Sequence, residues 1–423
     1  MLTVYSWLLR LLVPVILLRL FWRGLKNRGY WSRIPERFGF IPPLRAMRVL
    51  WVHAVSVGEV RAAVPLVKAL AARYPDHRLL ITTMTPTGSA QVPALFGDDV
   101  AHCYVPYDLP RVVARFLDRV RPDVAIIMET ELWPNLFDAC RTRSIPILIA
   151  NMRISEKSMR SYLKVPGFTA ATLAQPTVLA AQSQADADRL RELQAPPASI
   201  HVTGSIKYDV ALPASLREQA DALRIEWGRG RPVWLAASTH EGEEELVLKA
   251  HDELAKRFPD QLLIIVPRHP ERFATVTRLV RRAGCRVALR SENRSSLEST
   301  VEVLIGDTMG ELQLFYGAVD VAFVGGSLVP TGGHNLLEAA VVGTPTVFGP
   351  HMFNFQAISQ LTLERGAGVQ IADAAQLAPA IADFLGNANR RFEVGEAGKR
   401  LIAENRGAVA RTLRLIEGLL PGT

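Results

Sequence analysis

A chain of 423 residues, 49% hydrophobic and 21% charged, is too long for one ordinary core and too apolar to be disordered. Its net charge of +8 favours anionic partners such as anionic lipid or phosphorylated substrates. It has no arginine-rich stripe with interleaved aromatic residues, which argues against a nucleic-acid partner. Cys103, Cys140 and Cys285 are far apart, which argues against a disulfide scaffold or structural zinc and predicts three buried thiols in a reducing compartment.

The N-terminus is almost wholly apolar over residues 4–22, apart from Pro14, Arg10 and Arg19, and a basic segment from Arg23 to Arg37 follows. A signal peptide would carry its positive charge before the apolar run and a small-residue cleavage site after it. We therefore predict an anchor in or on the cytoplasmic leaflet, helped by anionic lipid, with the following domain on the cytoplasmic side. The run is marginal in length for a spanning helix, and a buried core helix is the alternative.

Short apolar runs then alternate with helical patterns, which is typical of parallel βαβ units. In the first half, helices are predicted over residues 59–73 and 110–120 and after Trp133-Pro134. The strands predicted to form one open sheet here are 48–55, 79–83, 100–105, 123–128, 146–150, 177–181 and 200–204.

A polar helical stretch, residues 215–227, ends at Gly-Arg-Gly-Arg-Pro (228–232), the best linker candidate. The alternation then restarts. Strands are predicted over 233–237, 262–267, 286–289, 301–305, 319–324 and 345–348, and helices over 243–258, 271–283 and 391–420. Two such α/β halves predict a cleft between strand carboxyl ends and helix N-termini. The predicted segments are an anchor with its basic flank (1–47), a first domain (48–212), a linker (213–232), a second domain (233–400) and a C-terminal helix (401–423).

Ser56-Val57-Gly58-Glu59 lies where the first predicted strand enters a helix. The helix dipole favours an ionised Glu59 in the first turn, as a general base requires. The same S-x-x-E spacing is a capping box, so on spacing alone the structural interpretation is favoured. Ser238 and Glu241 match a capping box in the same way, and Glu244 stands where a zinc-protease HExxH motif needs a different residue.

Further polar residues follow strands of both halves. Glu129 and Glu131 are two apart after a buried strand, so both can face one side of the cleft mouth if a cation or hydrogen bond relieves their repulsion. Lys207 follows the last strand of the first half and is either a surface lysine or a charge clamp. In the second half, Arg268 is held in a proline-stiffened turn and suits phosphate.

The densest signal is the glycine-rich segment 325–338, which leads into a helix N-terminus and predicts close backbone approach to a phosphate, with Glu338 available for ribose hydroxyls. The chain has no GxGxxG and no Walker motif, so hydride transfer and ATP hydrolysis lose support. Asp186-Ala187-Asp188 has the form of a metal-binding DxD. It stands at the start of a predicted helix, where acidic residues are expected for dipole reasons, and we predict metal independence.

Taken together, several motifs resemble those of the bacterial 3-deoxy-D-manno-octulosonic acid (Kdo) transferases, and the resemblance spans essentially the whole chain. They are SVGE (56–59), METELWP (128–134), TGSIKYD (203–209), STHEGEE (238–244), PRHPERF (267–273), GDTMGEL (306–312) and GGSLVPTGGHNLLE (325–338). The resemblance implies a GT-B fold, with CMP-Kdo as donor and the lipid A precursor lipid IVA as acceptor. It also implies a location on the cytoplasmic face of the bacterial inner membrane.

The resemblance also implies roles for individual residues. Glu59 becomes the general base, and Glu129 and Lys207 support the transition state. The residues implied to hold CMP are Pro267, Arg268, Thr308, Met309, Gly310, Asn335, Leu336, Leu337 and Glu338. No cofactor and no metal ligand is predicted. A two-domain sugar-nucleotide epimerase and a non-catalytic membrane scaffold that binds nucleotide remain the alternatives, and the sequence does not encode the number of Kdo units added.

Overall fold

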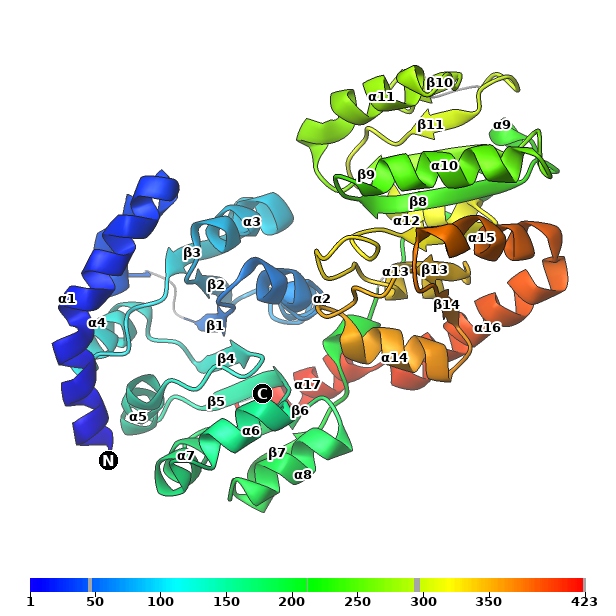
Figure 1. Cartoon of the computed structure of the whole chain (residues 1–423). Helices are drawn as coiled ribbons and strands as arrows, with labels where there is room; N and C mark the ends of the chain where they lie inside the picture. Colours follow the sequence, from blue (N-terminus) through cyan, green and yellow to red (C-terminus); the bar gives the residue numbers. More distant parts are fainter. Residues whose placement is uncertain (45–47, 211, 293–296, 421–423) are drawn as a thin grey trace. The chain divides into compact units, whose positions relative to one another are not determined.

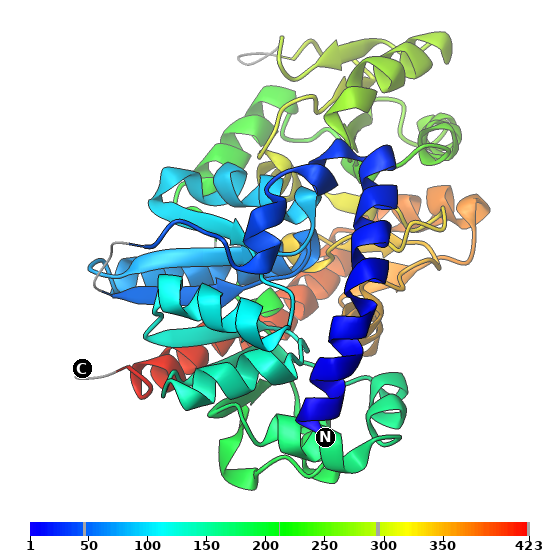
Figure 2. The same ribbon diagram turned by 90° about the vertical axis from the view of Figure 1, so that its left-hand side faces the viewer.

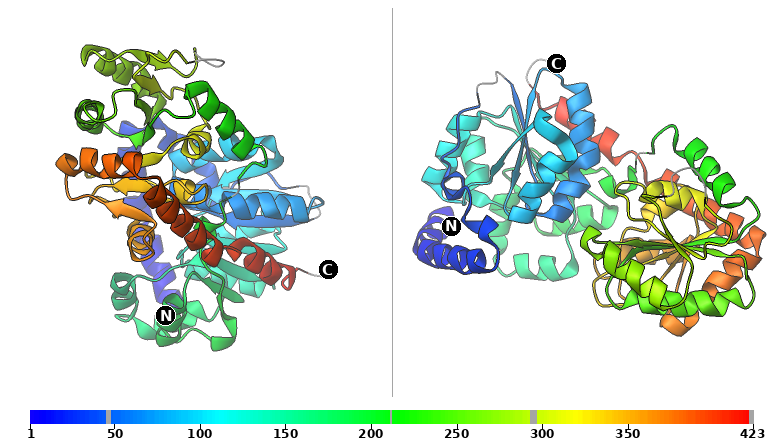
Figure 3. Two further views of the ribbon diagram at one scale, coloured as in Figure 1. Left: turned by 90° about the vertical axis from the view of Figure 1, so that its right-hand side faces the viewer. Right: turned by 90° about the horizontal axis from the view of Figure 1, so that it is seen from above.

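The computed structural model describes residues 1–44, 48–210, 212–292 and 297–420. It divides into two compact units: unit 1 is Met1–Asp209 with Asn405–Thr423, and unit 2 is Val210–Glu404. Each unit contains a seven-stranded parallel sheet with helices packed around it (Figures 1 and 3). The predicted α/β class, with two Rossmann-like sheets of the GT-B type and an apolar N-terminal helix, is confirmed.

The sheet of unit 1 has the strand order β3-β2-β1-β4-β5-β6-β7. Its strands are β1 (Val49–His53), β2 (Arg78–Thr83), β3 (Val100–Tyr104), β4 (Val124–Met128), β5 (Ile147–Met152), β6 (Val178–Ala181) and β7 (Ile200–Val202). The central strands are buried on both faces, which explains their continuous apolar sequences. Alternate residues of β1 enter different cores: Trp51 packs with Phe116 and Phe137 on one face, and Leu50 packs with Leu66 on the other.

Nine α-helices of unit 1 surround this sheet in the described part of the chain. They are α1 (Leu2–Lys26), α2 (Val57–Arg73), α3 (Pro86–Phe96), α4 (Pro110–Val120), α5 (Pro134–Thr142), α6 (Glu156–Tyr162), α7 (Pro166–Leu173), α8 (Gln184–Glu192) and α17 (Ala408–Glu417). Short 3-10 turns are η1 (Arg28–Trp31), η2 (Ile34–Phe38), η3 (Gly97–Asp99), η4 (Pro197–Ser199) and η5 (Ile206–Tyr208).

The sheet of unit 2 has the order β10-β11-β9-β8-β12-β13-β14. Its strands are β8 (Val233–Thr239), β9 (Leu262–Pro267), β10 (Val287–Leu289), β11 (Val303–Ile305), β12 (Val321–Val324), β13 (Thr346–Phe348) and β14 (Gly368–Gln370). Its helices are α9 (Leu216–Trp227), α10 (Glu243–Ala255), α11 (Phe273–Arg282), α12 (Leu312–Ala318), α13 (Leu337–Ala340), α14 (Gln356–Glu364), α15 (Leu377–Gly386) and α16 (Ala388–Asn405), with η6 (Pro270–Arg272) and η7 (Ala374–Gln376). The edge strand β14 was not predicted.

The segments predicted at the domain boundaries are themselves packed. The range 213–232, predicted as a linker, contains α9, whose Ala220 and Leu223 enter a core of unit 2. Arg231, in the predicted linker turn, donates to the carbonyl oxygens of Asp260 and Gln261 in the same unit. The predicted helix over 391–420 is two helices, because Gly407 adopts a φ of 96° between α16 and α17. The predicted boundary at residue 47 lies outside the described residues.

The N-terminal helix α1 is long and apolar enough to cross a membrane, by length and composition alone: its best 18-residue window has a mean hydropathy of 1.8. Only Ser6, Leu20 and Gly24 are buried along it, so the alternative of a buried core helix is wrong. Cys103 and Cys140 are buried as predicted, and burial raises the pKa of both thiols. Cys285 is only half-buried, which corrects the prediction for that residue.

Candidate active site

The strand order reverses between β1 and β4 in the middle of unit 1, and between β8 and β12 in the middle of unit 2. In open parallel sheets, ligands bind beyond the carboxyl ends of the strands at such a switch point. The segments 56–59 and 129–131 follow β1 and β4, and the segments 240–244 and 325–338 follow β8 and β12. The strongest sequence motifs therefore gather at the switch point of each unit.

Glu59, the predicted general base, closes the capping box at the start of α2. The Ser56 hydroxyl donates to Glu59 Oε1 at 2.9 Å, and the Val55 backbone N–H donates to Oε2 at 2.7 Å. In return, the Glu59 backbone N–H donates to Ser56 Oγ at 3.4 Å. The capping interpretation is thus confirmed as geometry. It does not by itself exclude chemistry, because each carboxylate oxygen keeps further acceptor capacity.

The environment of Glu59 changes its acidity. Its side chain is only 9% exposed, and burial raises its pKa to about 7. The neighbouring carboxylates of Glu131 and Glu129 raise it further, while the hydrogen bonds from Val55 and Ser56 act in the opposite direction. A carboxyl group that titrates near neutrality at a switch point is matched to proton transfer at physiological pH.

Glu129 and Glu131 are stabilised by different partners. Glu129 has a φ of 58°, an uncommon conformation for a non-glycine residue, and its Oε1 lies 3.9 Å from Lys207 Nζ. Glu131 accepts a hydrogen bond from Trp133 Nε1 at 2.9 Å, and burial raises the pKa of Glu131. The expected relief of repulsion is therefore present as a cation on one glutamate and an indole N–H on the other.

Two side chains hold the turn η5 that carries Lys207. Asn151 Oδ1 accepts the backbone N–H of Ile206 at 3.1 Å. Asp209 accepts the backbone N–H groups of Gly407 and Val409, both at 2.6 Å, at the start of α17. These bonds fix Lys207 beside Glu129, and the charges of Glu129 and Glu131 act on Glu59, so the four side chains form one cluster in unit 1.

The corresponding turn of unit 2 differs from its prediction. Ser238 has a φ of 56° and α10 begins only at Glu243, so the predicted Ser238–Glu241 capping box is wrong. The fully buried Glu243 carboxylate instead accepts the N–H groups of His240, Gly326, Ser327 and Leu328, at 2.7 to 3.1 Å. Three N–H groups of the glycine-rich loop, predicted to approach a phosphate, are thus bonded to a side chain of the protein.

Three histidines lie beside this turn. His240 Nε2 and His334 Nε2 are 2.9 Å apart and their rings are stacked, 11° from parallel. His269 packs edge-on against His240, with 5.5 Å between ring centroids. Burial lowers the pKa of His240, and the nearby charges of His269, Arg268 and Arg272 lower it further. Arg272 itself is paired with the buried carboxylate of Glu244, so this edge of the sheet is rich in cations and hydrogen-bond donors.

The residues predicted to hold CMP follow neighbouring strands of unit 2. Pro267 ends β9 and the Arg268 N–H donates to the Thr239 carbonyl at 3.0 Å, while Thr308, Met309 and Gly310 follow the adjacent strand β11. Thr308 donates to Glu311, and Met309 is 73% exposed. At the start of α13, Asn335 donates to Glu338 at 3.4 Å and accepts the Leu337 N–H, with Leu336 buried beside them. They share the carboxyl edge of the sheet, and near α13 hydrogen bonds join Asn335 to Leu337 and to Glu338.

The DxD-like segment has a structural role. Asp186 accepts hydrogen bonds from Ser183 Oγ at 2.5 Å and from the Ile154 N–H at 2.9 Å, which caps α8 and ties it to the end of β5. Asp188 pairs with Arg191 on the helix surface. Within residues 1–44, 48–210, 212–292 and 297–420, no group of three or more His, Cys, Asp or Glu residues is arranged to hold a metal ion.

The chain is similar in sequence to proteins of one known family. Residues 32–210 match the family described as 3-deoxy-D-manno-octulosonic-acid transferase (kdotransferase). Over 422 residues, the chain is 42% identical to the 3-deoxy-D-manno-octulosonic acid transferase of Haemophilus influenzae, and the match covers 98% of each protein. The chain belongs to this family. It is therefore a Kdo transferase, a glycosyltransferase, as the motifs predicted.

Two solved structures are also similar to this Kdo transferase. The C-terminal CMP-Kdo binding domain of WaaA from Acinetobacter baumannii is 34% identical, covers 45% of this chain and 99% of that domain, and has a TM-score of 0.43. UDP-GlcNAc 2-epimerase from Neisseria meningitidis is 14% identical, covers 88% of this chain and all of its own, and has a TM-score of 0.57. The second likeness shows the fold alone, so the family match favours the transferase over the predicted epimerase alternative.

Three residues of this Kdo transferase that lie at the switch points had no catalytic or binding role predicted from the sequence, although Glu131 was expected at the cleft mouth. Glu131 lies close enough to Glu59 to raise its pKa, and His240 with His334 forms the stacked pair. Both histidines stand within motifs that had been singled out, STHEGEE and GGHNLLE. Their pairing joins residues 94 positions apart, which no local spacing indicates.

Proposed function

We propose that this Kdo transferase moves Kdo from CMP-Kdo to lipid IVA, with inversion at the anomeric carbon and without a metal ion. The observation that carries the proposal is the Glu59 carboxyl group, which lies at the switch point of unit 1 with a pKa raised to about 7 by burial. At that pKa, a large fraction of the group is ionised at neutral pH while it remains basic enough to accept a proton.

In the proposed reaction, Glu59 removes the proton from a primary hydroxyl group of a glucosamine of lipid IVA. The oxygen then bonds to the anomeric carbon of Kdo as the bond from that carbon to the CMP phosphate oxygen breaks. CMP leaves with the bonding electrons, and the transition state carries oxocarbenium character, as in other glycosyl transfer. Attack from the face opposite CMP inverts the configuration.

Glu129 and Lys207 support this transition state. They form an ion pair whose members are each about one-third exposed, 35% and 34%, so both side chains can reach a bound substrate. A fixed ammonium group stabilises negative charge that develops on a departing phosphate, and its paired carboxylate limits where it can point. The φ of 58° at Glu129 is consistent with a functional constraint at this position.

The CMP moiety is assigned to unit 2. Arg268 supplies a guanidinium group suited to phosphate, and Thr308, Met309 and Gly310 offer backbone groups beside it. Asn335, Leu336, Leu337 and Glu338 complete the set. Glu338, which accepts a hydrogen bond from Asn335, is assigned to the ribose hydroxyls. Because the Gly326 and Ser327 N–H groups bind Glu243, we do not assign them to the phosphate.

The acceptor and the location follow from charge and from α1. A net charge of +8 suits a bisphosphorylated lipid and anionic membrane lipid. The apolar helix α1, with Arg23 and Lys26 in its last turn, attaches the enzyme to the cytoplasmic face of the bacterial inner membrane.

The experiment that tests this function is transfer of radiolabelled Kdo from CMP-Kdo to lipid IVA by the purified enzyme, with a chelator present and absent. We expect labelled lipid in both conditions. Conversion of the donor without lipid IVA would identify an epimerase, binding without turnover would identify a scaffold, and activity that is lost to the chelator and restored by magnesium would contradict metal independence.

A further inference from the structure

Helix α1 packs on the rest of unit 1 through one face. The residues of α1 that are buried or half-buried recur every three or four positions, which is the spacing of one face of an α-helix. They are Leu2, Tyr5, Ser6, Leu9, Val13, Ile16, Leu20 and Gly24, and every other residue of the helix is exposed. This stripe runs from the first turn of the helix to the last, and the amino-terminal half of the helix lies beside α4 and α5 (Figure 2).

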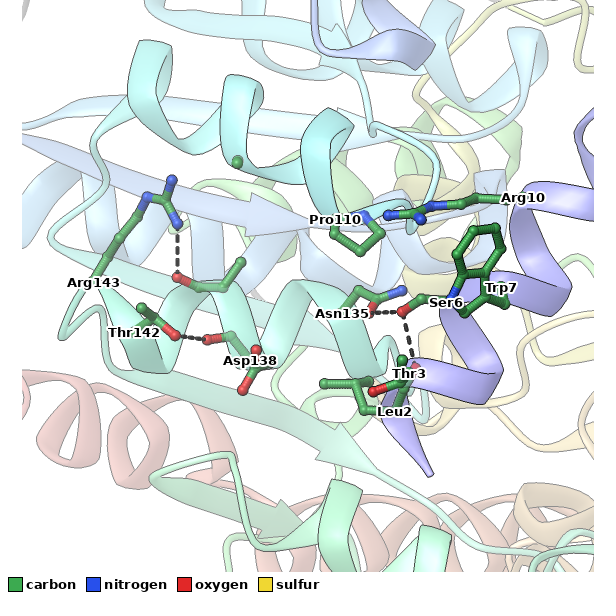
Figure 4. Close-up of a pocket in the computed structure, with 12 residues that line it drawn as sticks. Leu2, Thr3, Ser6, Trp7, Arg10, Pro110, Asn135, Asp138, Thr142 and Arg143 are labelled. Carbon is green, nitrogen blue, oxygen red and sulfur yellow. Dashed lines mark hydrogen bonds between the residues drawn. The ribbon is translucent and has the colours of Figure 1, made fainter.

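The first two turns of α1 are bonded to unit 1. The Tyr5 hydroxyl donates to Asp108 Oδ2 at 3.0 Å. The Ser6 hydroxyl donates to Asn135 Oδ1 at 2.7 Å, as Figure 4 shows. The rings of Tyr5 and Phe168 are 5.4 Å apart. Asp108 is itself fixed, because it also accepts N–H groups at the start of α5. The amino end of the helix is therefore held on the surface of the enzyme.

The carboxyl end of α1 is also held against neighbouring parts of unit 1. Trp31, in the following turn η1, lies over Gly24 so closely that a Cβ there would be 1.8 Å from the indole nitrogen. The same indole N–H donates to the Phe21 carbonyl at 3.2 Å. Two residues later, Arg33 donates to the His102 carbonyl in β3 at 2.8 Å. Both ends of the helix are thus held by other elements of unit 1.

The outward face of α1 is apolar, and Arg10 and Arg19 lie at the edges of that face. Eleven exposed large apolar residues cover it: Val4, Trp7, Leu8, Leu11, Leu12, Val15, Leu17, Leu18, Phe21, Trp22 and Leu25. At 3.6 residues per turn, Arg10 and Arg19 project roughly 80–100° from the buried stripe, on opposite flanks. Arg10 lies over the Trp7 ring and beside a cavity of about 380 Å³ between α1, α4 and α5, with its guanidinium towards Pro110 (Figure 4).

We propose that α1 lies in the plane of the membrane, immersed in one leaflet of phospholipid, with both of its ends on the side of unit 1. The proposal rests on the membrane attachment in the proposed function and goes beyond it by excluding a bilayer-crossing helix. A helix of this length extends about 37 Å and would carry Met1 across a core about 30 Å thick, away from Arg33. Crossing would break the contacts of Tyr5 and Ser6 and would expose the polar groups of the stripe to lipid. Lying flat, the helix buries its apolar face while Arg10 and Arg19 reach the headgroups from either flank.

The first test locates the amino end. The full-length enzyme is made with a protease-removable tag before Met1, or with the same tag after Thr423 as the control for the side of unit 1. We expect both tags to be cleaved in inverted inner-membrane vesicles and neither in right-side-out spheroplasts. Cleavage of the N-terminal tag in spheroplasts overturns the proposal, as does its protection in inverted vesicles in which the C-terminal tag is removed.

The second test measures depth along the helix. Nitroxide labels are placed, one at a time, by Val4→Cys, Leu11→Cys, Leu18→Cys and Leu25→Cys in a Cys285→Ser background, because these four positions share the outward face. The enzyme is bound to phosphatidylethanolamine–phosphatidylglycerol vesicles, and the depth of each nitroxide is measured from its collisions with oxygen and with a polar relaxation agent. We expect equal immersion depths at all four positions. A label at Val13→Cys should be shielded. Labels deepest at 11 and 18 and shallow at 4 and 25 overturn the proposal. Repeating both tests in Glu59→Gln separates them from transfer, since neither result depends on turnover.

Discussion

The turns that follow the first strand of each sheet provide two versions of one arrangement. In unit 1, Glu59 is 9% exposed, and among the residues that the structure describes its carboxylate accepts hydrogen bonds from Ser56 and Val55 of its own turn alone. In unit 2, Glu243 is fully buried and binds four backbone N–H groups, three of them from the loop after β12. Burial raises the pKa of both glutamates.

The difference lies in where the hydrogen-bond donors come from. The donors of Glu59 are local, so its carboxylate is free to serve a second partner, and the carboxylates nearby make it a better base. The donors of Glu243 join the end of β8 to the end of β12, so its carboxylate has the place that a ligand phosphate has in other glycine-rich loops. We infer that the first glutamate serves chemistry and the second serves structure.

The largest expected effect separates these roles directly. Glu59→Gln should lower kcat by roughly a hundred- to ten-thousand-fold, because a neutral amide cannot accept the proton. Stability should not follow activity. Since the pKa of Glu59 is raised from 4.5 to about 7, its ionisation costs the wild-type enzyme stability as pH rises through that range, and the amide has no such loss.

Transfer assays and thermal unfolding at pH 8 check this prediction. We expect a folded, inactive variant whose Tm is at least that of the wild type. Ser56→Ala removes the cap but keeps the carboxylate. It should lower the free energy of unfolding by about 1 kcal/mol and should reduce activity far less than Glu59→Gln does. Near-normal turnover by Glu59→Gln would refute the base assignment.

Lys207→Met tests the role of the ammonium group in unit 1. Loss of a cation that stabilises developing charge should lower kcat by about a hundred-fold, with little change in the Tm, and Lys207→Arg should recover part of the loss. Steady-state kinetics with both substrates provide the measurement. Lys157→Met, at an exposed lysine of α6, is the matched control. Equal kinetics for Lys207→Met and the control would leave Lys207 a surface residue.

Glu243→Ala tests the second unit. Four backbone N–H groups would lose their acceptor, and we expect the free energy of unfolding to fall by about 3 kcal/mol, because buried donors without partners are costly. Denaturant unfolding measures this change. Glu245→Ala, at an exposed glutamate in the same helical turn, should have almost no effect. Unchanged stability in Glu243→Ala would contradict the structural role inferred for Glu243.

The smallest expected effect concerns pH. For the wild type, kcat/KM should fall on the acid side of a pKa near 7, because only ionised Glu59 accepts a proton. Glu131→Gln removes one of the negative charges that raise this pKa, so the acid limb should move to lower pH by a fraction of a unit. Burial is the larger cause and remains. A pH–rate profile checks the direction, and Glu156→Gln on the exposed face of α6 should leave the profile in place.

The sequence predicted the fold well where the signal was local. Buried strands such as Val124–Met128 are continuous apolar runs, and their alternation with helices predicted both sheets. The Ser56–Glu59 cap was predicted for the same reason, since its donors and acceptors lie within five residues. Ser238–Glu241 was mispredicted because the distant loop after β12 binds Glu243 and sets where α10 begins. The His240–His334 pair and the Lys207–Glu129 pair depend on residues brought together only by the strand order.

The packing of α17 in unit 1 affects how the enzyme folds during its synthesis. Unit 1 includes α17, whose Ala408 and Ile416 enter its core and whose Arg411 donates to the Thr203 carbonyl at 2.7 Å. Domains usually fold in order as they leave the ribosome. Here the amino-terminal unit stays incomplete until all of unit 2 has been translated. Asp209, two residues from Lys207, finds its partners Gly407 and Val409 only then, so the turn that carries the candidate catalytic lysine is fixed in place by residues synthesised after unit 2.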